Sequence, residues 1–331
     1  MILITGGAGY IGSHVNKLLS NEGFETLIVD NLELGKREAV KWGEFVECDL
    51  ADKEKLREVF QSHDIDAVMH FAAYTSVGES MKYPQMYMEN NYENTLNLLN
   101  VMSEFNVDKF IFSSTASVYG TPEHLPIKED HRLKPINPYG ESKVKVEVEL
   151  KRRSAEEGLK YVSLRYFNAS GDDPDKEIGE EHEPETHLIP LIMDTAIGKR
   201  NEISIYGEDY PTTDGTCIRD YIHVNDIAQA HLLAYNYLMD GGESDYFNLG
   251  DGKGFSVKQV IDEVMKITGI HFQVEIGERR PGDPAILIAD STKIRDKLGW
   301  EPRESSLTNI VNTAWRWHLE LNFRKHNYFE D

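Results

Sequence analysis

Cysteine is scarce in this chain of 331 residues, where Cys48 and Cys217 are the only 2. Two thiols so far apart in sequence lack the spacing of a disulfide framework or of a zinc site. We therefore expect both thiols to be reduced and structural, and we predict no metal site.

Long apolar runs are also missing. No segment approaches the roughly 20 consecutive apolar residues that a membrane-spanning helix requires. The chain opens directly on the strand pattern of residues 1–5, without the basic and apolar regions of a secretory signal. The sequence therefore predicts a cytoplasmic protein with no membrane partner.

Basic residues are few: 35 Lys and Arg stand against 57 Asp and Glu, for a formal net charge of -22. Binding to nucleic acid needs clustered Lys and Arg, so we predict no nucleic acid partner. An anionic small molecule remains compatible with the acidic body if a few Arg residues gather in one cleft. We interpret the acidity itself as a contribution to solubility rather than to catalysis.

The first half of the chain alternates short β-branched runs with helical patterns, which is typical of βαβ units and a parallel sheet. We expect strands at residues 2–4, 26–29, 43–46, 67–70, 109–112 and 160–165. Helices are expected at residues 10–21, 52–63, 84–105 and 139–157. The sequence therefore predicts an α/β fold, a Rossmann-like doubly wound parallel sheet whose sixth strand completes the core.

The pattern changes after Asn168, where residues 171–185 are acidic, rich in turn formers and without period. Beyond them we expect helices at 190–197, 225–239, 257–268, 292–298 and 306–320, and strands at 203–206 and 272–275. We predict a first domain of residues 1–168, with 218–245 packing back onto it. A smaller C-terminal α/β lobe comprises residues 169–217 and 246–331.

A glycine-rich turn, with Gly6, Gly9 and Gly12, follows the first expected strand and opens the first helix. Free backbone N–H groups at such a helix start suit a pyrophosphate, and the glycines let it approach. Asp30 ends the next strand, where an acid accepts hydrogen bonds from ribose hydroxyls and repels a 2′-phosphate. The pattern predicts NAD rather than NADP, the alternative being that Asp30 only caps its turn. Asp49, after the third strand, either contacts the adenine or caps the next helix.

Tyr139 and Lys143 stand four residues apart at the start of an expected helix, so their side chains leave the same face. A nearby ammonium favours the phenolate and can make the tyrosine a general base. Thr115, after the fifth strand, offers a hydroxyl to the same substrate oxygen. Ser113 and Ser114 are alternatives that we interpret as strand-end caps, and a Tyr/Lys pair alone is often plain helix surface.

With these residues identified, nearly the whole chain resembles the extended short-chain dehydrogenase/reductase family, and within it the nucleotide-sugar epimerases. The resemblance is carried by residues 5–14, 70–73, 77–80, 112–120, 138–143, 164–168, 207–224 and 280–283. It implies a Rossmann-like NAD domain, a smaller lobe for a UDP-sugar, and a homodimer packed through two long helices of each NAD domain. The implied reaction inverts C4 of a UDP-hexose through a 4-keto intermediate, with tightly bound NAD regenerated in each turnover.

The resemblance also implies roles for individual residues. Tyr139 is expected to be the base, Lys143 to set its pKa and anchor a ribose, and Thr115 to be the hydroxyl partner. The other residues expected to contact NAD are Gly6, Gly9, Tyr10, Ile11, Gly12, Asp30, Asn31, Asp49, Leu50, Phe71, Ala72, Ala73, Thr75, Asn90 and Phe167. The residues expected to contact the UDP-sugar are Thr115, Tyr139, Asn168, Leu188, Ser204, Tyr206, Arg219, Arg280, Asp283 and Leu287. Of these, Asn168, Arg219 and Arg280 are expected at the diphosphate.

Three positions depart from the family pattern. Thr115 replaces a serine and keeps the hydroxyl. Thr75 stands where some relatives carry a cofactor-contacting lysine, a loss that can loosen cofactor retention. Leu287 stands where some relatives carry a bulky tyrosine, so the sugar pocket is predicted to admit a 2-acetamido group unless Leu287 faces the core.

Other functions share parts of this pattern. A nucleotide-sugar 4,6-dehydratase needs an acid pair after the hydroxyl residue to eliminate water, and here Ala116 and Ser117 hold those positions. An epimerase or decarboxylase of UDP-glucuronate needs a further cation for the carboxylate, and the sequence leaves this alternative open. A non-catalytic NAD-sensing regulator would have no use for Tyr139 and Lys143.

Overall fold

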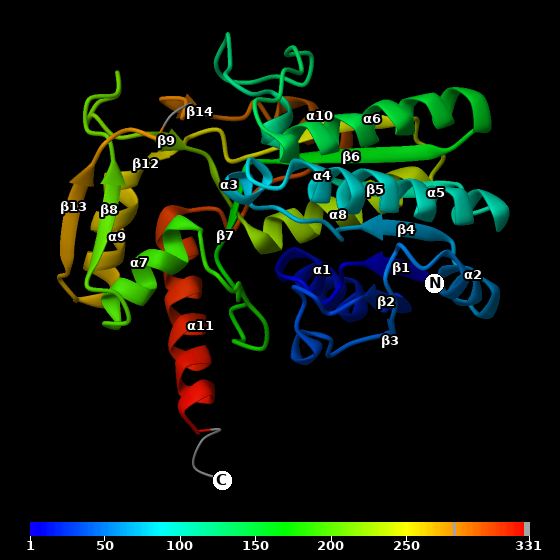
Figure 1. Ribbon diagram of the computed structural model, residues 1–331, viewed down its shortest axis with the longest axis horizontal. Helices are drawn as coiled ribbons and strands as arrows, with labels where there is room; N and C mark the ends of the chain where they lie inside the picture. The colour runs from blue at the N-terminus through cyan, green and yellow to red at the C-terminus, as the bar shows by residue number, and fades with distance from the viewer. Residues whose placement is uncertain (281–282, 328–331) are drawn as a thin grey trace.

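A parallel sheet of seven strands occupies the centre of the larger lobe in the computed structural model, which describes residues 1–280 and 283–327 (Figure 1). The strands are β1 (Ile2–Thr5), β2 (Thr26–Asp30), β3 (Glu44–Glu47), β4 (Ala67–His70), β5 (Lys109–Thr115), β6 (Lys160–Tyr166) and β11 (Asp245–Leu249). Their order is β11-β6-β5-β4-β1-β2-β3, and each neighbouring pair is parallel. The predicted α/β doubly wound fold is confirmed.

The order of the strands reverses at β1, which pairs with β2 on one side and with β4 on the other. In a doubly wound sheet, the crevice at the carboxyl ends of such strands is where a dinucleotide binds. Gly6 follows β1, Asp30 ends β2 and Phe71 follows β4. The topology therefore brings the predicted cofactor residues to one edge of the sheet.

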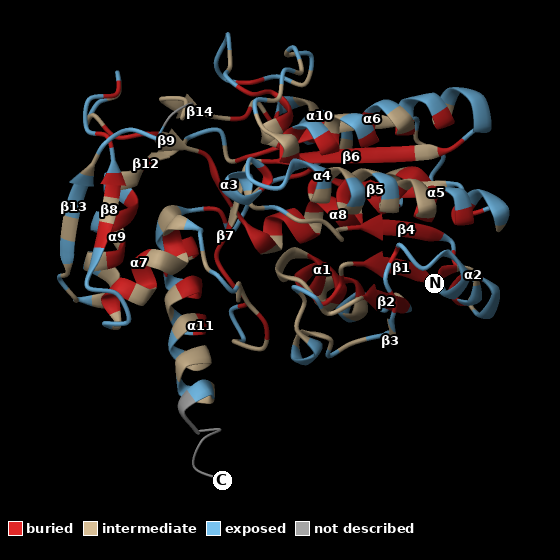
Figure 2. Cartoon of the chain, viewed as in Figure 1, coloured by how far each residue is buried: buried red, intermediate tan, exposed pale blue. Residues whose placement is uncertain are grey.

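Helices cover both faces of this sheet. They are α1 (Tyr10–Asn21), α2 (Lys53–Ser62), α5 (Asn94–Glu104), α6 (Pro138–Glu157) and α8 (Val224–Met239). Side chains of α1 and α8 share one buried cluster with Ile4, whereas α2, α5 and α6 share a second cluster with Leu3. Successive residues of β1, β2 and β4 thus point to opposite buried faces, which explains why these central strands are mostly apolar (Figure 2). The edge strand β3 is partly exposed.

The helix expected at residues 84–105 forms, but it contains a π-helical turn that was not expected. It comprises α4 (Pro84–Met88), the π turn (Glu89–Glu93) and α5 without a break. Within the π turn, Asn91 is buried, and its amide group exchanges hydrogen bonds of 2.8 and 2.9 Å with the backbone of Tyr74. Hydrophobic periodicity does not report such a local widening, which often marks a functional site.

The expectation that a sixth strand completes the sheet is wrong, because β11 pairs with the outer side of β6. β11 follows α8 and lies about 80 residues after β6 in the sequence, so its pairing with β6 is a long-range contact. Several short strands were likewise not expected. They are β7 (Asn168–Ser170), β9 (Ile218–Arg219), β10 (Tyr221–His223), β12 (Phe255–Ser256) and β14 (Ile286–Leu287).

The smaller lobe has a core of its own, at the left in Figure 1. It contains α7 (Leu188–Ala196), β8 (Glu202–Tyr206), α9 (Val257–Thr268), β13 (Gln273–Gly277) and α11 (Leu307–Asn327). None of the helices within residues 1–280 and 283–327 combines the length and apolar character needed to cross a membrane.

The predicted domain boundaries stay a prediction, which we propose to amend. β11 extends to Leu249, and Ile294 of α10 (Thr292–Leu298) and Trp300 pack into a core cluster of the larger lobe. We therefore propose that residues 245–250 and 290–300 belong with the larger lobe. Residues 328–331, at the end of the predicted second domain, lie outside the described residues.

Candidate active site

The glycine turn after β1 closes against neighbouring backbone. Gly6 has φ +74°, and a Cβ there would lie 2.4 Å from the backbone N of Ala72. A Cβ on Gly12 would lie 2.4 Å from the carbonyl oxygen of Gly6. Only glycine fits at both positions, so these glycines let the turn pack closely against the loop after β4 and against the start of α1, as expected of a dinucleotide-binding turn.

Asp30 ends β2 directly beside this turn and is 8% exposed. Its carboxylate accepts hydrogen bonds from Ala8 N at 3.0 Å and from Leu32 N at 2.9 Å. Burial raises the pKa of Asp30, and these two hydrogen bonds oppose the rise. Asp30 therefore caps its own turn through Leu32 N. It also binds the glycine turn through Ala8 N.

Asp49 does not cap the helix that follows it. Asp52 is the N-cap of α2 and accepts a hydrogen bond from Lys55 N at 3.1 Å. Asp49 instead accepts from Asn31 Nδ2 at 2.9 Å and lies near the end of β2. This placement favours the reading in which Asp49 faces a nucleotide.

Tyr139 and Lys143 lie in the first turns of α6, whose N-cap is Asn137, and Pro138 is the first helical residue. Their exposed fractions are 9% and 2%. Lys143 Nζ donates to the carbonyl of Ser113 at 2.9 Å and lies 6.0 Å from the centroid of the Tyr139 ring. The pair is thus a buried tyrosine and a buried amine at the end of β5, not helix surface.

Burial sets the ionisation of both groups. It raises the pKa of Tyr139 to about 12, and a hydrogen bond with Thr115 opposes the rise. It lowers the pKa of Lys143 to about 7, against the attraction of Glu147. The alternatives to Thr115 are bonded elsewhere, because Ser114 donates to Glu147 at 2.7 Å and Ser113 shares a short hydrogen bond with Tyr166.

The cations predicted for the substrate lie outside the central sheet, one in a short strand and one in a loop. Arg219, in β9, donates to the carbonyl of Pro284 at 2.8 Å, and its guanidinium lies 3.7 Å from the carboxylate of Asp283. The guanidinium of Arg280 lies 4.0 Å from the centroid of the Tyr206 ring. Both cations therefore have fixed neighbours, and Tyr206 is 42% exposed beneath Arg280.

A model described as the NAD dependent epimerase/dehydratase family matches residues 2–250. The chain belongs to this family. A UDP-glucose 4-epimerase of Halalkalibacterium halodurans is 50% identical over 319 residues, which are 96% of each chain. The crystal structure of UDP-glucose 4-epimerase from Brucella ovis in complex with NAD is 45% identical, with TM-score 0.94, and covers 96% of this chain and 98% of that one. The UDP-Glc/GlcNAc 4-epimerase of Campylobacter jejuni is 44% identical, with TM-score 0.85 over 96% and 99%.

Membership in the NAD dependent epimerase/dehydratase family confirms the predicted resemblance and NAD as the cofactor. One pocket gathers most of the predicted cofactor residues. They are Gly6, Gly9, Asp30, Asn31, Asp49, Leu50, Phe71, Ala72, Ala73 and Asn90. Their individual roles stay predictions, and the pocket is where this family member would hold its cofactor.

The same pocket includes residues that we did not expect from the sequence: Val29, Glu33, Leu34, Gly35, Cys48 and Tyr74. Gly35 could have been predicted from the sequence, because it is a glycine in the loop just after Asp30. A Cβ on Gly35 would lie 2.7 Å from Asp30 Oδ1. No feature of the sequence indicated Tyr74. Its hydroxyl donates to the carboxylate of Glu33 at 2.8 Å.

Other predicted residues lie elsewhere within the described chain. Tyr10 donates a short hydrogen bond to the carbonyl of Gly171, and Ile11 packs against a core cluster of the larger lobe. Phe167 and Leu287 pack against the small buried cluster of Val118, Tyr119 and Ile127. Thr75 is in the loop after β4, beside the lining residue Tyr74.

The substrate residues not yet placed lie at three points. Asn168 opens β7 and donates to the carbonyl of Asp220 at 2.8 Å, Leu188 opens α7, and Ser204 is in β8. Pro281 and Gly282, inside the predicted stretch 280–283, lie outside the described residues. Leu287 is half-buried, so the alternative in which it faces the core is partly met.

Proposed function

We propose that this chain inverts C4 of a UDP-hexose and so interconverts UDP-glucose and UDP-galactose. The observation that carries the proposal is the convergence of Tyr139, Lys143 and Thr115 at the end of β5. The relatives named UDP-glucose 4-epimerase support the choice of reaction.

The proton chemistry belongs to Tyr139. Its oxygen takes the proton of the sugar 4-hydroxyl while the hydride on C4 leaves, and it returns that proton when the ketone is reduced. With a pKa of about 12 the phenol is protonated at neutral pH, so the base needs positive charge nearby. Lys143 supplies one such charge in its protonated form, which at a pKa of about 7 is about half of the molecules at pH 7. When bound, NAD would supply the hydride acceptor and a cationic ring.

Thr115 and Ser113 hold this pair in place. The Thr115 hydroxyl reaches Tyr139 and also accepts from Ser117 N at 3.1 Å, which fixes its rotamer. The Ser113 carbonyl holds Lys143 Nζ. We propose Thr115 as the partner of the reacting sugar oxygen.

Inversion requires the 4-ketone to present its other face, so the nucleotide must stay bound while the sugar turns about its diphosphate bonds. Arg219, Arg280 and Asn168 are proposed to bind the diphosphate, since guanidinium groups suit forked phosphate contacts. Ser204, Tyr206, Asp283 and Leu188 are proposed to contact the nucleoside. Contacts to the hexose are expected to be few, because rigid ones would prevent the turn.

The direct test is incubation of the purified protein with UDP-galactose and no added reductant. We expect UDP-glucose to accumulate until equilibrium, measured by chromatography of the nucleotide sugars. A 4-keto-6-deoxy product would instead indicate a 4,6-dehydratase. Conversion of UDP-glucuronate alone would indicate an epimerase or decarboxylase of that sugar. No conversion of either substrate would indicate a non-catalytic regulator.

We further propose that the sugar pocket accepts a 2-acetamido group. Leu287 is smaller than the tyrosine found in some relatives, and the Campylobacter jejuni relative is named for UDP-Glc and GlcNAc. Conversion of UDP-N-acetylgalactosamine, and its selective loss in Leu287→Tyr, is the expected result. If Leu287→Tyr converts both substrates as wild type does, Leu287 does not set this specificity.

We also propose a cytoplasmic homodimer that packs through α5 and α6. Val148 on α6 is 64% exposed, which is unusual for an apolar residue on a long helix and suits an interface. Light scattering coupled to gel filtration should show a dimer for wild type and a monomer for Val148→Asp. A wild-type monomer would contradict the proposal.

A further inference from the structure

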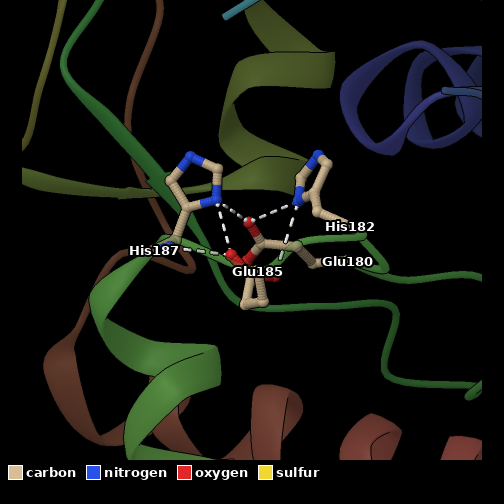
Figure 3. Close-up of side chains that lie close together, drawn as sticks. All are labelled: Glu180, His182, Glu185 and His187. Atoms are coloured by element: carbon tan, nitrogen blue, oxygen red, sulfur yellow. Dashed lines mark hydrogen bonds and ion pairs between the residues drawn. The ribbon is translucent and has the colours of Figure 1, made fainter. Parts of the chain in front are cut away.

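The acidic segment between β7 and α7 contains a Glu-x-His-x-x-Glu-x-His pattern formed by Glu180, His182, Glu185 and His187. The four side chains converge just before α7, with both imidazoles turned toward the two carboxylates (Figure 3). Each offers one ligand atom, and all four atoms lie within 4.8 Å of one another. Two imidazoles and two carboxylates are a ligand set of the kind that holds a divalent transition metal ion.

The separations fit a single ion at the centre of this cluster. His182 Nδ1 lies 3.3 Å from Glu180 Oε1 and 3.6 Å from Glu185 Oε2. His187 Nδ1 lies 2.9 Å from Glu180 Oε1 and 3.0 Å from Glu185 Oε1. A tetrahedral Zn²⁺ with bonds of about 2.0–2.2 Å separates its ligand atoms by about 3.3–3.6 Å, so small adjustments suffice.

The carboxylates of this cluster lack a permanent cation. Their side chains are 6% exposed in Glu180 and 13% in Glu185, and among the described residues their ion pairs are with the two histidines. His182 Nδ1 is buried and makes no hydrogen bond of good geometry in the described part of the chain, although both carboxylates lie within 3.6 Å of it.

In a neighbouring cluster of the same segment, a lysine neutralises the carboxylates. Asp173, Asp175 and Glu177 surround Lys17 Nζ, which lies 2.8 Å from each carboxylate. There a lysine from α1 supplies the central charge. Glu180 and Glu185 are arranged around a centre that no lysine or arginine of the described chain fills.

We propose that Glu180, His182, Glu185 and His187 bind one Zn²⁺ ion, or a divalent transition metal ion of the same preferences. Four protein ligands make a closed site, which indicates a structural role. Each imidazole coordinates as the neutral base, so the ion displaces two protons. The expectation of no metal, drawn from the two cysteines, overlooked this Glu/His spacing.

The site lies where it would join both lobes. The His182 ring contacts the edge of Tyr10, the first residue of α1, at a centroid distance of 6.4 Å. The carbonyl of Glu180 accepts from Trp317 Nε1 of α11 at 3.1 Å. His187 is the N-cap of α7 and is 49% exposed, which leaves an entry path. A bound ion would therefore fasten the start of α1 to the helices of the smaller lobe.

The test uses the full-length protein, stripped with EDTA and then titrated with Zn²⁺ or Co²⁺. We expect one equivalent of Zn²⁺ per chain by elemental analysis, and visible absorption typical of tetrahedral Co²⁺. With free Zn²⁺ at about 100 times Kd, Tm should rise by about 3–8 °C. The double variant His182→Gln/His187→Gln should lose all three effects.

The matched control is Asp175→Asn/Glu177→Gln, which changes two carboxylates of the same segment that face Lys17. It should bind Zn²⁺ as wild type does. The proposal is overturned if wild type binds no more Zn²⁺ than the double histidine variant, or binds it with neither the Co²⁺ spectrum nor the rise in Tm. If the histidine variant does not fold, stripped and loaded wild type decide the question alone. Turnover of UDP-galactose is measured separately, so failure of either proposal leaves the other testable.

Discussion

The two lobes position their site residues in different ways. In the larger lobe, Asp30, Tyr139 and Lys143 are 8%, 9% and 2% exposed and stand at the ends of paired strands or in the first turns of a long helix. In the smaller lobe, Tyr206 is 42% exposed, and Arg280 stands in the exposed loop after β13. The predicted cofactor and catalytic residues are therefore buried and held by paired strands and a long helix, whereas Tyr206 and Arg280, which we propose contact the substrate, stand at the surface.

The largest effect should come from the buried frame. Tyr139→Phe removes the proposed base and should lower kcat by about 10²–10⁴-fold, with the fold and bound NAD retained. Initial rates with UDP-galactose measure it. Tyr206→Phe in the other lobe is the matched control and should keep kcat within a few fold. Equal losses in both variants would contradict the contrast between the lobes.

Asp30→Asn should weaken NAD binding by about 10–100-fold, because it removes the charge from a buried acceptor beside the glycine turn. Fluorescence titration of the stripped protein measures the NAD Kd, and KM for UDP-galactose should change little once NAD saturates. Asp49→Asn is the control with the smaller expected change. A raised KM at saturating NAD would show that the frame also serves the substrate.

The amine of Lys143 should make stability depend on pH in the protein stripped of NAD. Burial lowers its pKa to about 7, from an ordinary value near 10.5, and Glu147, His70 and Tyr139 face it. Below pH 7 the amine is charged in both folded and unfolded chains, so the full cost of burying the charge is present. Between about pH 7 and 10 only the unfolded chain holds the proton, so folding gains stability as pH rises.

This gain should be on the order of 2–3 kcal/mol between pH 6.5 and 9, relative to Lys143→Met. Urea unfolding of both proteins at each pH measures the difference and cancels the other titrating groups. A difference that stays constant, or that falls with pH, would mean that the Lys143 amine is not buried as a neutral base.

The smallest effect should come from the exposed groups. Arg280→Ala should raise KM for UDP-galactose by about 3–10-fold with little change in kcat or bound NAD, since exposed charged contacts contribute modestly. Arg279→Ala is the matched control, because Arg279 packs on Tyr210 at 4.2 Å and pairs with Asp209. If Arg280→Ala lowers kcat as much as Tyr139→Phe does, the two lobes do not divide catalysis and substrate binding between them.

Local spacing in the sequence predicted much of the site. Gly6 and Asp30 follow strands whose apolar runs are readable, and the i,i+4 relation of Tyr139 and Lys143 needs only a helix to bring them to one face. The sequence failed to predict two local structures that depend on residues far away in the chain. The π turn at Glu89–Glu93 accompanies bonds between Asn91 and Tyr74, and β11 exists as a strand through its pairing with β6.

Six of the seven strands, the glycine turn, the acid at the end of β2 and the Tyr/Lys pair were predictable from the sequence, because each depends on residues close along the chain. The tertiary structure alone decided that Asp52 rather than Asp49 caps α2, and that Ser113 and Ser114 are bonded elsewhere while Thr115 reaches Tyr139. It also decided the burial that moves the pKa values of Tyr139 and Lys143 in opposite directions. Burial and hydrogen-bond competition depend on neighbours from other elements, and the linear order of residues does not contain those neighbours.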